Sequence, residues 1–139
     1  MEKYSQSKKS NLQILEDPSV CYISGSFFEL SMHNISKNYI KKILQLTKLT
    51  LLELISIVPI SIDTYKRKTT FKPPVTEKIL EIEEVYRKGI DVFGITFHKW
   101  MDTENIALGS IIPKSLLKNS FGTRLLLDEI GKIEYGVLA

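Results

Sequence analysis

A chain of 139 residues and 15.9 kDa can form one compact domain or two very small ones that share a core. Hydrophobic residues make up 43% of it and charged residues 25%, values that are typical of globular proteins and exclude a wholly disordered chain. No apolar run approaches the roughly 20 residues that cross a bilayer, and the polar start "MEKYSQSKKSN" lacks the apolar core of a signal peptide. We therefore expect a cytoplasmic protein that does not enter a membrane.

The net charge of +3 is distributed unevenly along the chain. Residues 1–70 contain ten Lys and Arg against six Asp and Glu, a balance of +4, whereas residues 71–139 contain nine against ten, a balance of −1. This asymmetry favours a first part that contacts a polyanion, and the alternative is an ordinary solvated surface.

Residues 1–34 show weak periodicity and are expected to form an N-terminal arm. The stretch "VCYISGSFFEL" is rich in β-branched and aromatic residues, which favours a short strand or an extended arm there. From Ile35 onward the pattern is helical. In "SKNYIKKILQLTKL" an apolar stripe faces a row of lysines, and Ser36 is placed to cap the helix.

Two more short helices follow in "TLLELISIVPIS" and "SIDTYKRKTTF". Thr50 and Glu53 have the spacing of a capping box at the start of the first. Pro59 cannot continue that helix, because it has no N–H and clashes with the preceding turn. Ser61 restarts the next one. Three short helices in a row are therefore predicted.

A long helix, "TEKILEIEEVYRKGIDVFG", is expected after the break at "KPPVT", with Gly94 at its end. Its near-heptad apolar positions are Ile79, Ile82, Tyr86 and Phe93. The remainder predicts a compact helical set: "TFHKWMDTENIAL", then "PKSLL" opened by Pro113, then a last helix from Ser120 to about Tyr135. The fold class is all-α: a helix-turn-helix module joined by a long helix to a small helical domain.

Catalytic chemistry finds little support in the chain. No glycine pattern is able to cradle a phosphate, and the acidic cluster Glu81, Glu83 and Glu84 lies on the polar side of the long helix, which predicts a solvated face. No serine is marked as activated. One cysteine (Cys21) excludes an internal disulfide, and with His33 and His98 it cannot supply a zinc site. We expect no enzyme, no catalytic residue, no metal and no cofactor.

The basic run on the third short helix is a better candidate site. Its layout resembles a helix-turn-helix, in which the second motif helix enters the major groove of DNA. Asp63 is unfavourable near DNA unless it caps the helix. The alternative is again a solvated face. The predicted DNA-binding residues are Ser61, Thr64, Tyr65, Lys66, Arg67, Lys68 and Lys72.

The last forty residues carry a more specific pattern, from "WMDTENIALGSIIPKSLL" to "IEYGV". The pattern resembles the toxin-binding domain of the Xre/MbcA/ParS antitoxin family. The matching residues are Trp100, Asn105, Ala107, Leu108, Gly109, Pro113, Leu116, Leu117, Gly122, Ile133, Glu134, Gly136 and Val137. The departures are Met101 for Leu, Asn119 for Thr, Ile130 for Leu and Lys132 for Arg, and of these only Asn119 could remove a helix cap.

The stretch "LLELISIVPISIDTYKRK" resembles the family's Xre-like helix-turn-helix more loosely, with Pro59 where the turn usually has Gly.

Several residues of this pattern also have structural roles that can be inferred without the family resemblance. Trp100 is expected in a core, Gly109 and Gly122 in turns or close packing, and Ile130 and Ile133 inward with Leu126. Gly136 is the expected residue after the helix end, in the left-handed conformation.

The resemblance implies a function and three parts: an arm (1–34), an Xre-like module with a linking helix (35–88) and a toxin-binding domain (89–139). It implies an antitoxin that occludes the cleft of a RES-domain toxin, a family associated with NAD⁺ breakdown, and that represses its own operon as a homodimer on operator DNA. The alternative is a stand-alone helix-turn-helix regulator. The implied toxin-binding residues are Lys132, Glu134, Tyr135, Gly136, Val137, Leu138 and Ala139. The alternative is that this apolar tail folds back onto the chain's own helices.

Overall fold

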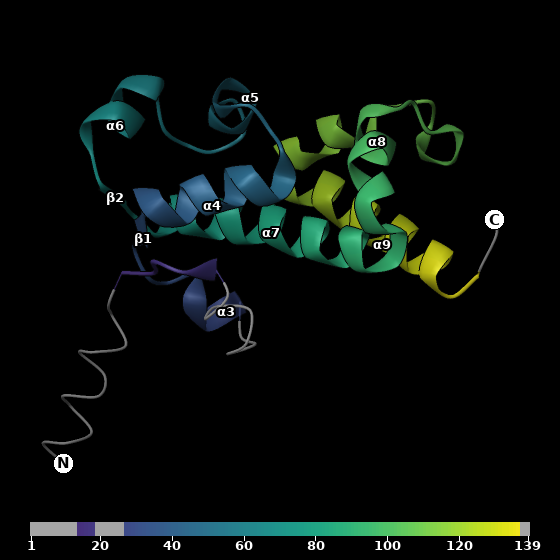
Figure 1. Cartoon of the computed structure of the whole chain (residues 1–139), viewed down its shortest axis with the longest axis horizontal. Coiled ribbons are helices and arrows are strands. Elements are labelled where there is room, and N and C mark those ends of the chain that lie inside the picture. The colour runs from purple at the N-terminus through teal and green to yellow at the C-terminus, as the bar shows by residue number, and fades with distance from the viewer. Residues whose placement is uncertain (1–13, 19–26, 137–139) are drawn as a thin grey trace, which may run out of the picture. The chain divides into compact units, whose positions relative to one another are not determined.

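The computed structural model describes residues 14–18 and 27–136, and its described elements are almost all helical (Figure 1). The all-α prediction is therefore confirmed. The chain divides into two units, one up to Leu80 and one from Glu81, so that the boundary falls inside helix α7 (Pro73–Phe93). The predicted boundaries after residues 34 and 88 stay predictions.

A small sheet in the first unit was not expected from the sequence. Strands β1 (Ile35–Ser36) and β2 (Thr70–Phe71) pair antiparallel, with Ile35 opposite Phe71. Leu15 forms a parallel bridge to Ile35 on the other side, where its N–H donates to the Asn34 carbonyl at 2.8 Å. Strands of two residues have no alternating pattern to recognise, because only their partners define them.

The expected strand or extended arm in "VCYISGSFFEL" is wrong where the chain is described. Residues 20–26 lie outside the described residues, and Phe27–Leu30 form a one-turn helix, α3. The local backbone bonds to itself: the Ser31 N–H donates to the Phe27 carbonyl at 2.9 Å, and the Ser31 hydroxyl donates to the Phe28 carbonyl at 2.6 Å. The β-branched and aromatic residues gave the wrong expectation here, because such preferences depend on packing against a neighbouring strand.

Helix α4 (Lys37–Thr47) begins as predicted. The Ser36 side chain accepts a hydrogen bond from the Tyr39 N–H at 3.0 Å, and Lys48 ends the helix in the left-handed conformation at φ 58°. The apolar stripe is buried, with Tyr39 and Ile43 fully inaccessible to solvent. Burial of this stripe fixes which side of α4 carries its lysines.

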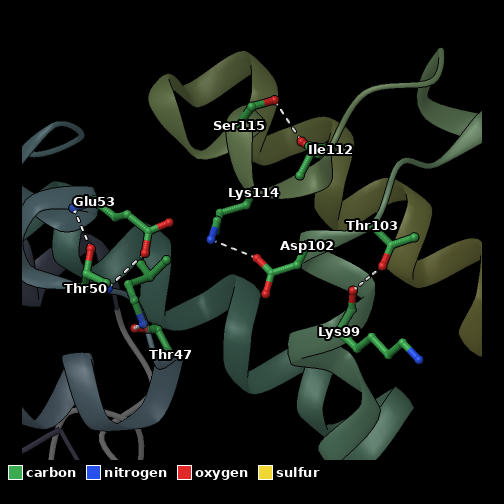
Figure 2. Close-up of polar contacts among 10 residues, drawn as sticks. Thr47, Thr50, Glu53, Lys99, Asp102, Thr103, Ile112, Lys114 and Ser115 are labelled. Carbon is green, nitrogen blue, oxygen red and sulfur yellow. Dashed lines mark hydrogen bonds and ion pairs between the residues drawn. The ribbon is translucent and has the colours of Figure 1, made fainter.

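The predicted capping box opens helix α5 (Leu51–Ile55). Figure 2 shows its two reciprocal bonds: the Glu53 N–H donates to the Thr50 hydroxyl at 3.1 Å, and the Thr50 N–H donates to the Glu53 carboxylate at 3.0 Å. A turn around Pro59 leads to α6 (Ile62–Arg67), which Ser61 caps. This helix ends earlier than "SIDTYKRKTTF" predicts, because residues 70 and 71 pair with β1 instead.

In the second unit, the inward face of α7 includes an unexpected acidic residue. Ile82, Val85 and Tyr86 are buried there, and so is Glu83, which is 0% exposed. Arg87, one turn later, donates to the Glu83 carboxylate at 2.8 Å. The prediction of a solvated face is therefore wrong for Glu83, which is buried with a cationic partner on the same helix.

Aromatic side chains connect α7 with α8 (Phe97–Asp102). Phe97 is fully buried and meets the Tyr86 ring edge-on at 5.4 Å between centroids. A Cβ at Gly89 would collide with the Phe97 ring, so this glycine lets the ring lie directly on the backbone of α7. Trp100 stacks on Phe93 at 5.2 Å but is only half-buried, so it lines the edge of this aromatic cluster.

The last helix packs on a 3₁₀ segment, Pro113–Lys118, which Pro113 opens as predicted. Helix α9 (Ser120–Glu134) follows, and its cap is not lost: the Asn119 side chain accepts the Gly122 N–H at 2.9 Å. A Cβ at Gly122 would collide with the Leu116 carbonyl, which confirms the predicted close packing.

Candidate interaction surfaces

The first candidate surface is the predicted DNA-binding helix α6. The hydroxyls of Ser61 and Thr64 bond to each other at 3.0 Å, and the Ser61 oxygen also accepts the Thr64 N–H at 3.1 Å. Both side chains therefore define the start of the helix. Ser61 provides the cap, and Asp63 lies exposed in the first turn.

Of the predicted DNA-binding residues, the basic ones share an exposed segment and the aromatic one does not. Lys66, Arg67, Lys68 and Lys72 are exposed. Tyr65 is 6% exposed and stacks on Phe71 with 5.8 Å between ring centroids. Burial raises the pKa of the Tyr65 phenol. Tyr65 therefore supports the basic segment from inside and does not belong to the exposed set.

Sequence reasoning missed a residue that holds this segment in place. The Lys37 ammonium donates to the Lys66 carbonyl at 3.1 Å and lies 4.9 Å from the centroid of the Tyr65 ring. The Lys37 backbone N–H also donates to the Thr69 carbonyl at 2.8 Å. A cation at the carboxyl end of a helix is favourable, because the last carbonyls carry partial negative charge. The contact spans 29 residues of sequence, so no local pattern could have revealed it.

The second candidate surface is the outer side of α9, towards its carboxyl end. Lys132 and Tyr135 lie there, and Tyr135 is 79% exposed. Glu134 is exposed as well, but it continues the row of the buried residues Leu126 and Ile130, four residues apart each time. The structure thus places Lys132 and Tyr135 on one side of α9 and Glu134 on another.

Two further residues share the side of Lys132 and Tyr135, and sequence reasoning did not single them out. Phe121 is 76% exposed and Leu125 is 53% exposed. The spacing of 121, 125, 132 and 135 repeats about every 3.6 residues, so these four side chains form one row along the helix. We call Phe121, Leu125, Lys132 and Tyr135 the α9 row. The spacing was readable in the sequence, but the burial of the opposite side was needed to show that this row is the outer one.

The end of α9 has the predicted geometry. Gly136 has φ 68° and its N–H donates to the Ile133 carbonyl at 3.1 Å. A left-handed residue at this place is typically glycine, because other side chains are strained there. The predicted toxin-binding residues Val137, Leu138 and Ala139 lie outside the described residues.

Two other properties bear on function. Among the described residues, no group of three or more His, Cys, Asp or Glu side chains is placed to hold a metal ion. No helix in the described ranges is long and apolar enough to cross a membrane.

Comparison with known proteins finds a match within the second unit. Residues 89–136 match the family model of the antitoxin Xre/MbcA/ParS C-terminal toxin-binding domain. This part of the chain is similar to the toxin-binding domain of the Xre/MbcA/ParS antitoxins. A 72-residue region of the chain, 50% of its length, is also 35% identical to the protein called antitoxin Xre of Yersinia enterocolitica, and the match spans about half (49%) of that relative.

The match covers Phe93, Phe97 and Trp100 of the aromatic cluster and the whole α9 row, and it leaves out Tyr86. It begins at Gly89, where the Phe97 ring meets α7, and ends at Gly136, where α9 is terminated. Within the matched region an ion pair joins α8 to the 3₁₀ segment, with 2.8 Å between the Lys114 ammonium and the Asp102 carboxylate (Figure 2). The resemblance drawn from the sequence is therefore confirmed.

Proposed function

We propose that this chain is the antitoxin of a type II toxin–antitoxin pair and that its second unit binds the toxin. The family match to a toxin-binding domain supports a protein client. The observation that carries the proposal is the α9 row, because two aromatic side chains and one leucine stay exposed on a single side of the last helix. Exposed aromatic anchors concentrate the binding energy of protein interfaces.

In this proposal the antitoxin acts by occlusion. The α9 row contacts the toxin, and the apolar residues Val137, Leu138 and Ala139 contribute to covering the toxin's cleft. Lys132 of the row and the exposed charges near it, Arg124 and Asp128, provide polar contacts at the rim. The client is a RES-type toxin that degrades NAD⁺ in the cytoplasm, so the antitoxin needs no catalytic group of its own.

The test is to co-express the chain with the reading frame next to it in the genome and to purify the complex. Leu125→Ala and Phe121→Ala should each weaken toxin binding by about 2 kcal/mol. Leu52→Ala is the matched control, because Leu52 is a leucine of the first unit that is 72% exposed. Equal loss in the control, or no loss in either α9 variant, contradicts the proposed surface. A partner that consumes no NAD⁺ contradicts the RES assignment alone.

A second function, repression of its own operon, is proposed for the first unit. The support is the succession of α5, a turn around Pro59 and α6, together with four exposed basic residues in and after the last turn of α6: Lys66, Arg67, Lys68 and Lys72. In a helix-turn-helix the second helix enters the major groove, and a homodimer reads a palindromic operator. Replacing Lys66, Arg67 and Lys68 together with Ala should abolish operator binding in a gel shift and leave toxin binding intact.

The alternative is a stand-alone regulator that has no toxin. In that case the exposed basic segment would keep its role, and the α9 row would have no client. Co-purification distinguishes the two, because a stand-alone regulator leaves the neighbouring gene product in the flow-through.

A further inference from the structure

The lysines of α4 and the basic residues at the end of α6 and after it belong to two stretches that contain no acidic residue. Residues 35–52 hold four lysines and residues 64–76 hold three lysines and one arginine, with no Asp or Glu in either. Between them lie Glu53, whose carboxylate accepts the Thr50 N–H, and Asp63 in the first turn of α6. Two stretches of one charge sign are unusual for a surface that only needs to be solvated, since such surfaces commonly mix both signs.

The fold brings these two stretches together at a defined place. Lys37, the first residue of α4, reaches the Lys66 carbonyl at 3.1 Å, and its backbone N–H bonds to Thr69. The start of α4 therefore lies directly beside the segment Lys66–Lys68. The positive charges of both stretches repel one another there, and an anionic partner relieves that repulsion.

Only one side of α4 lies in line with the basic segment Lys66–Lys68. Lys41 lies one turn after Lys37, on the same side of the helix, and is exposed. Lys42 is the next residue around the helix, and its ammonium lies 3.8 Å from the Asp17 carboxylate. Two adjacent lysines of one helix thus differ in direction and in charge environment.

We propose that Lys37 and Lys41 extend the DNA-binding surface beyond the helix-turn-helix, by contacting the phosphate backbone next to the site of α6. This inference rests on the proposed DNA binding of the first unit. Phosphate is the expected target, because lysine ammonium groups outside the groove meet the backbone and carry no sequence preference. Lys37 has a second task in this surface: it positions the Lys66–Lys68 segment through the Lys66 carbonyl.

The experiment measures DNA affinity as a function of salt for the full chain. The probes are a labelled duplex of the DNA immediately upstream of the chain's own reading frame and a random duplex of equal length. Lys41→Ala should lower the slope of log K against log salt by about 0.9 on both probes, as expected for one lost phosphate contact. Lys42→Ala is the matched control and should change the slope by less than half as much.

Lys37→Met tests the positioning task, because methionine keeps an apolar stem beside Tyr65 and loses the ammonium. It should weaken binding to the upstream duplex more than to the random one. The variant removes one positive charge, which affects both duplexes, and it also displaces the Lys66–Lys68 segment from its alignment with the operator bases, which affects only the upstream duplex. Lys37→Arg should restore most of the affinity. Melting curves of each variant show whether the fold is intact.

The outcomes separate this inference from the function on which it rests. If the wild type binds neither duplex at about 50 mM salt, where phosphate contacts are strong, both the DNA-binding function and the inference fail. If the wild type binds but Lys41→Ala keeps the full slope, only the inference fails. Equal slope changes in Lys41→Ala and Lys42→Ala also refute it, because they indicate a diffuse charge effect without a defined contact.

Discussion

Gly122 and Gly131 lie in the same helix, α9, but in different surroundings. Gly122 is buried, and a Cβ there would collide with the backbone carbonyl of Leu116. At Gly131, apart from its chain neighbours and the backbone of α9 itself, no described atom lies within 4 Å of the place that a Cβ would take. The same residue type therefore has opposite consequences at the two positions, since one glycine permits close packing and the other only loosens a helix.

This contrast predicts the effect of adding one methyl group at each site. Gly131→Ala should raise the free energy of unfolding by about 0.5–1 kcal/mol, because alanine is the better helix former. Gly122→Ala should lower it by about 1–3 kcal/mol, because a backbone carbonyl cannot move aside like a flexible side chain. Denaturant titrations of both variants check this. Equal signs for the two changes would contradict the packing described between α9 and the 3₁₀ segment.

Glu84 gives a pH-dependent prediction at the same scale. Partial burial, and then the nearby Glu81, raise the pKa of Glu84 above its ordinary value of 4.5, against a smaller opposite effect of Lys88. The folded chain therefore holds this proton to higher pH than the unfolded chain. The contribution of Glu84 to stability falls as pH rises from the ordinary value through the raised one.

Glu84→Gln should accordingly stabilise the chain at neutral pH. The gain should disappear in acid below the ordinary pKa, where both folded and unfolded chains carry a protonated Glu84. Melting temperatures of the variant and the wild type, measured from about pH 3 to about pH 8, test this, because that interval includes the ordinary pKa values of carboxyl groups. A constant difference at every pH would show that the gain comes from something other than titration.

At the scale of single elements, short helices begin at side chains that accept the first free N–H groups. Ser36, Thr50, Ser61 and Asn119 each cap the helix that follows. The caps at Thr50 and Ser61 stabilise helices of five and six residues, which would not form alone in water. Helix α6 depends strongly on its cap, because it has only six residues.

Ser61 separates capping from contact with DNA. Ser61→Ala should lower the free energy of unfolding by about 1 kcal/mol, whereas Ser61→Asp should keep the cap and the stability. If the first turn of α6 faces DNA, Ser61→Asp should still weaken DNA binding, because its carboxylate repels phosphate. Fluorescence anisotropy and denaturation of both variants decide this. Wild-type affinity in Ser61→Asp would place the DNA on another face of the unit.

At the scale of the whole molecule, the chain has two units with different charge and different exposed surfaces. The first unit carries the exposed basic residues Lys66, Arg67, Lys68 and Lys72. The second unit carries the α9 row and contains the residues that match the toxin-binding domain. The proposed functions divide in the same way. A variant in one surface should therefore leave the other function unchanged.

Shortening the chain after Gly136 tests the role of the tail. Helix α9 already ends at Glu134, and Leu126 and Ile130 stay buried, so the fold should be retained. Toxin binding should weaken by about 2 kcal/mol or more, because apolar anchors carry much of the binding energy. Melting temperature and affinity are measured on the same shortened protein. Reduced stability together with intact neutralisation would mean that the tail packs on its own domain.

Local chemistry within a few residues was predictable from the sequence. The caps at Ser36, Thr50 and Ser61, the helix start at Pro113 and the left-handed Gly136 were predicted and are present, because neighbours along the chain decide them. The C-terminal family pattern was readable for the same reason, since it consists of residues at fixed short spacings.

Tertiary structure alone decided which side of each element faces solvent. Tyr65 was predicted to meet DNA and is buried on Phe71, and Glu83 was predicted to be solvated and is buried with Arg87. Phe121 and Leu125 were not singled out, yet they form the outer side of α9. Periodicity shows which side chains share a face of an element. Which face is covered depends on contacts between residues far apart in the chain, such as Lys37 with Lys66 and Ile35 with Phe71, and only the folded chain brings these together.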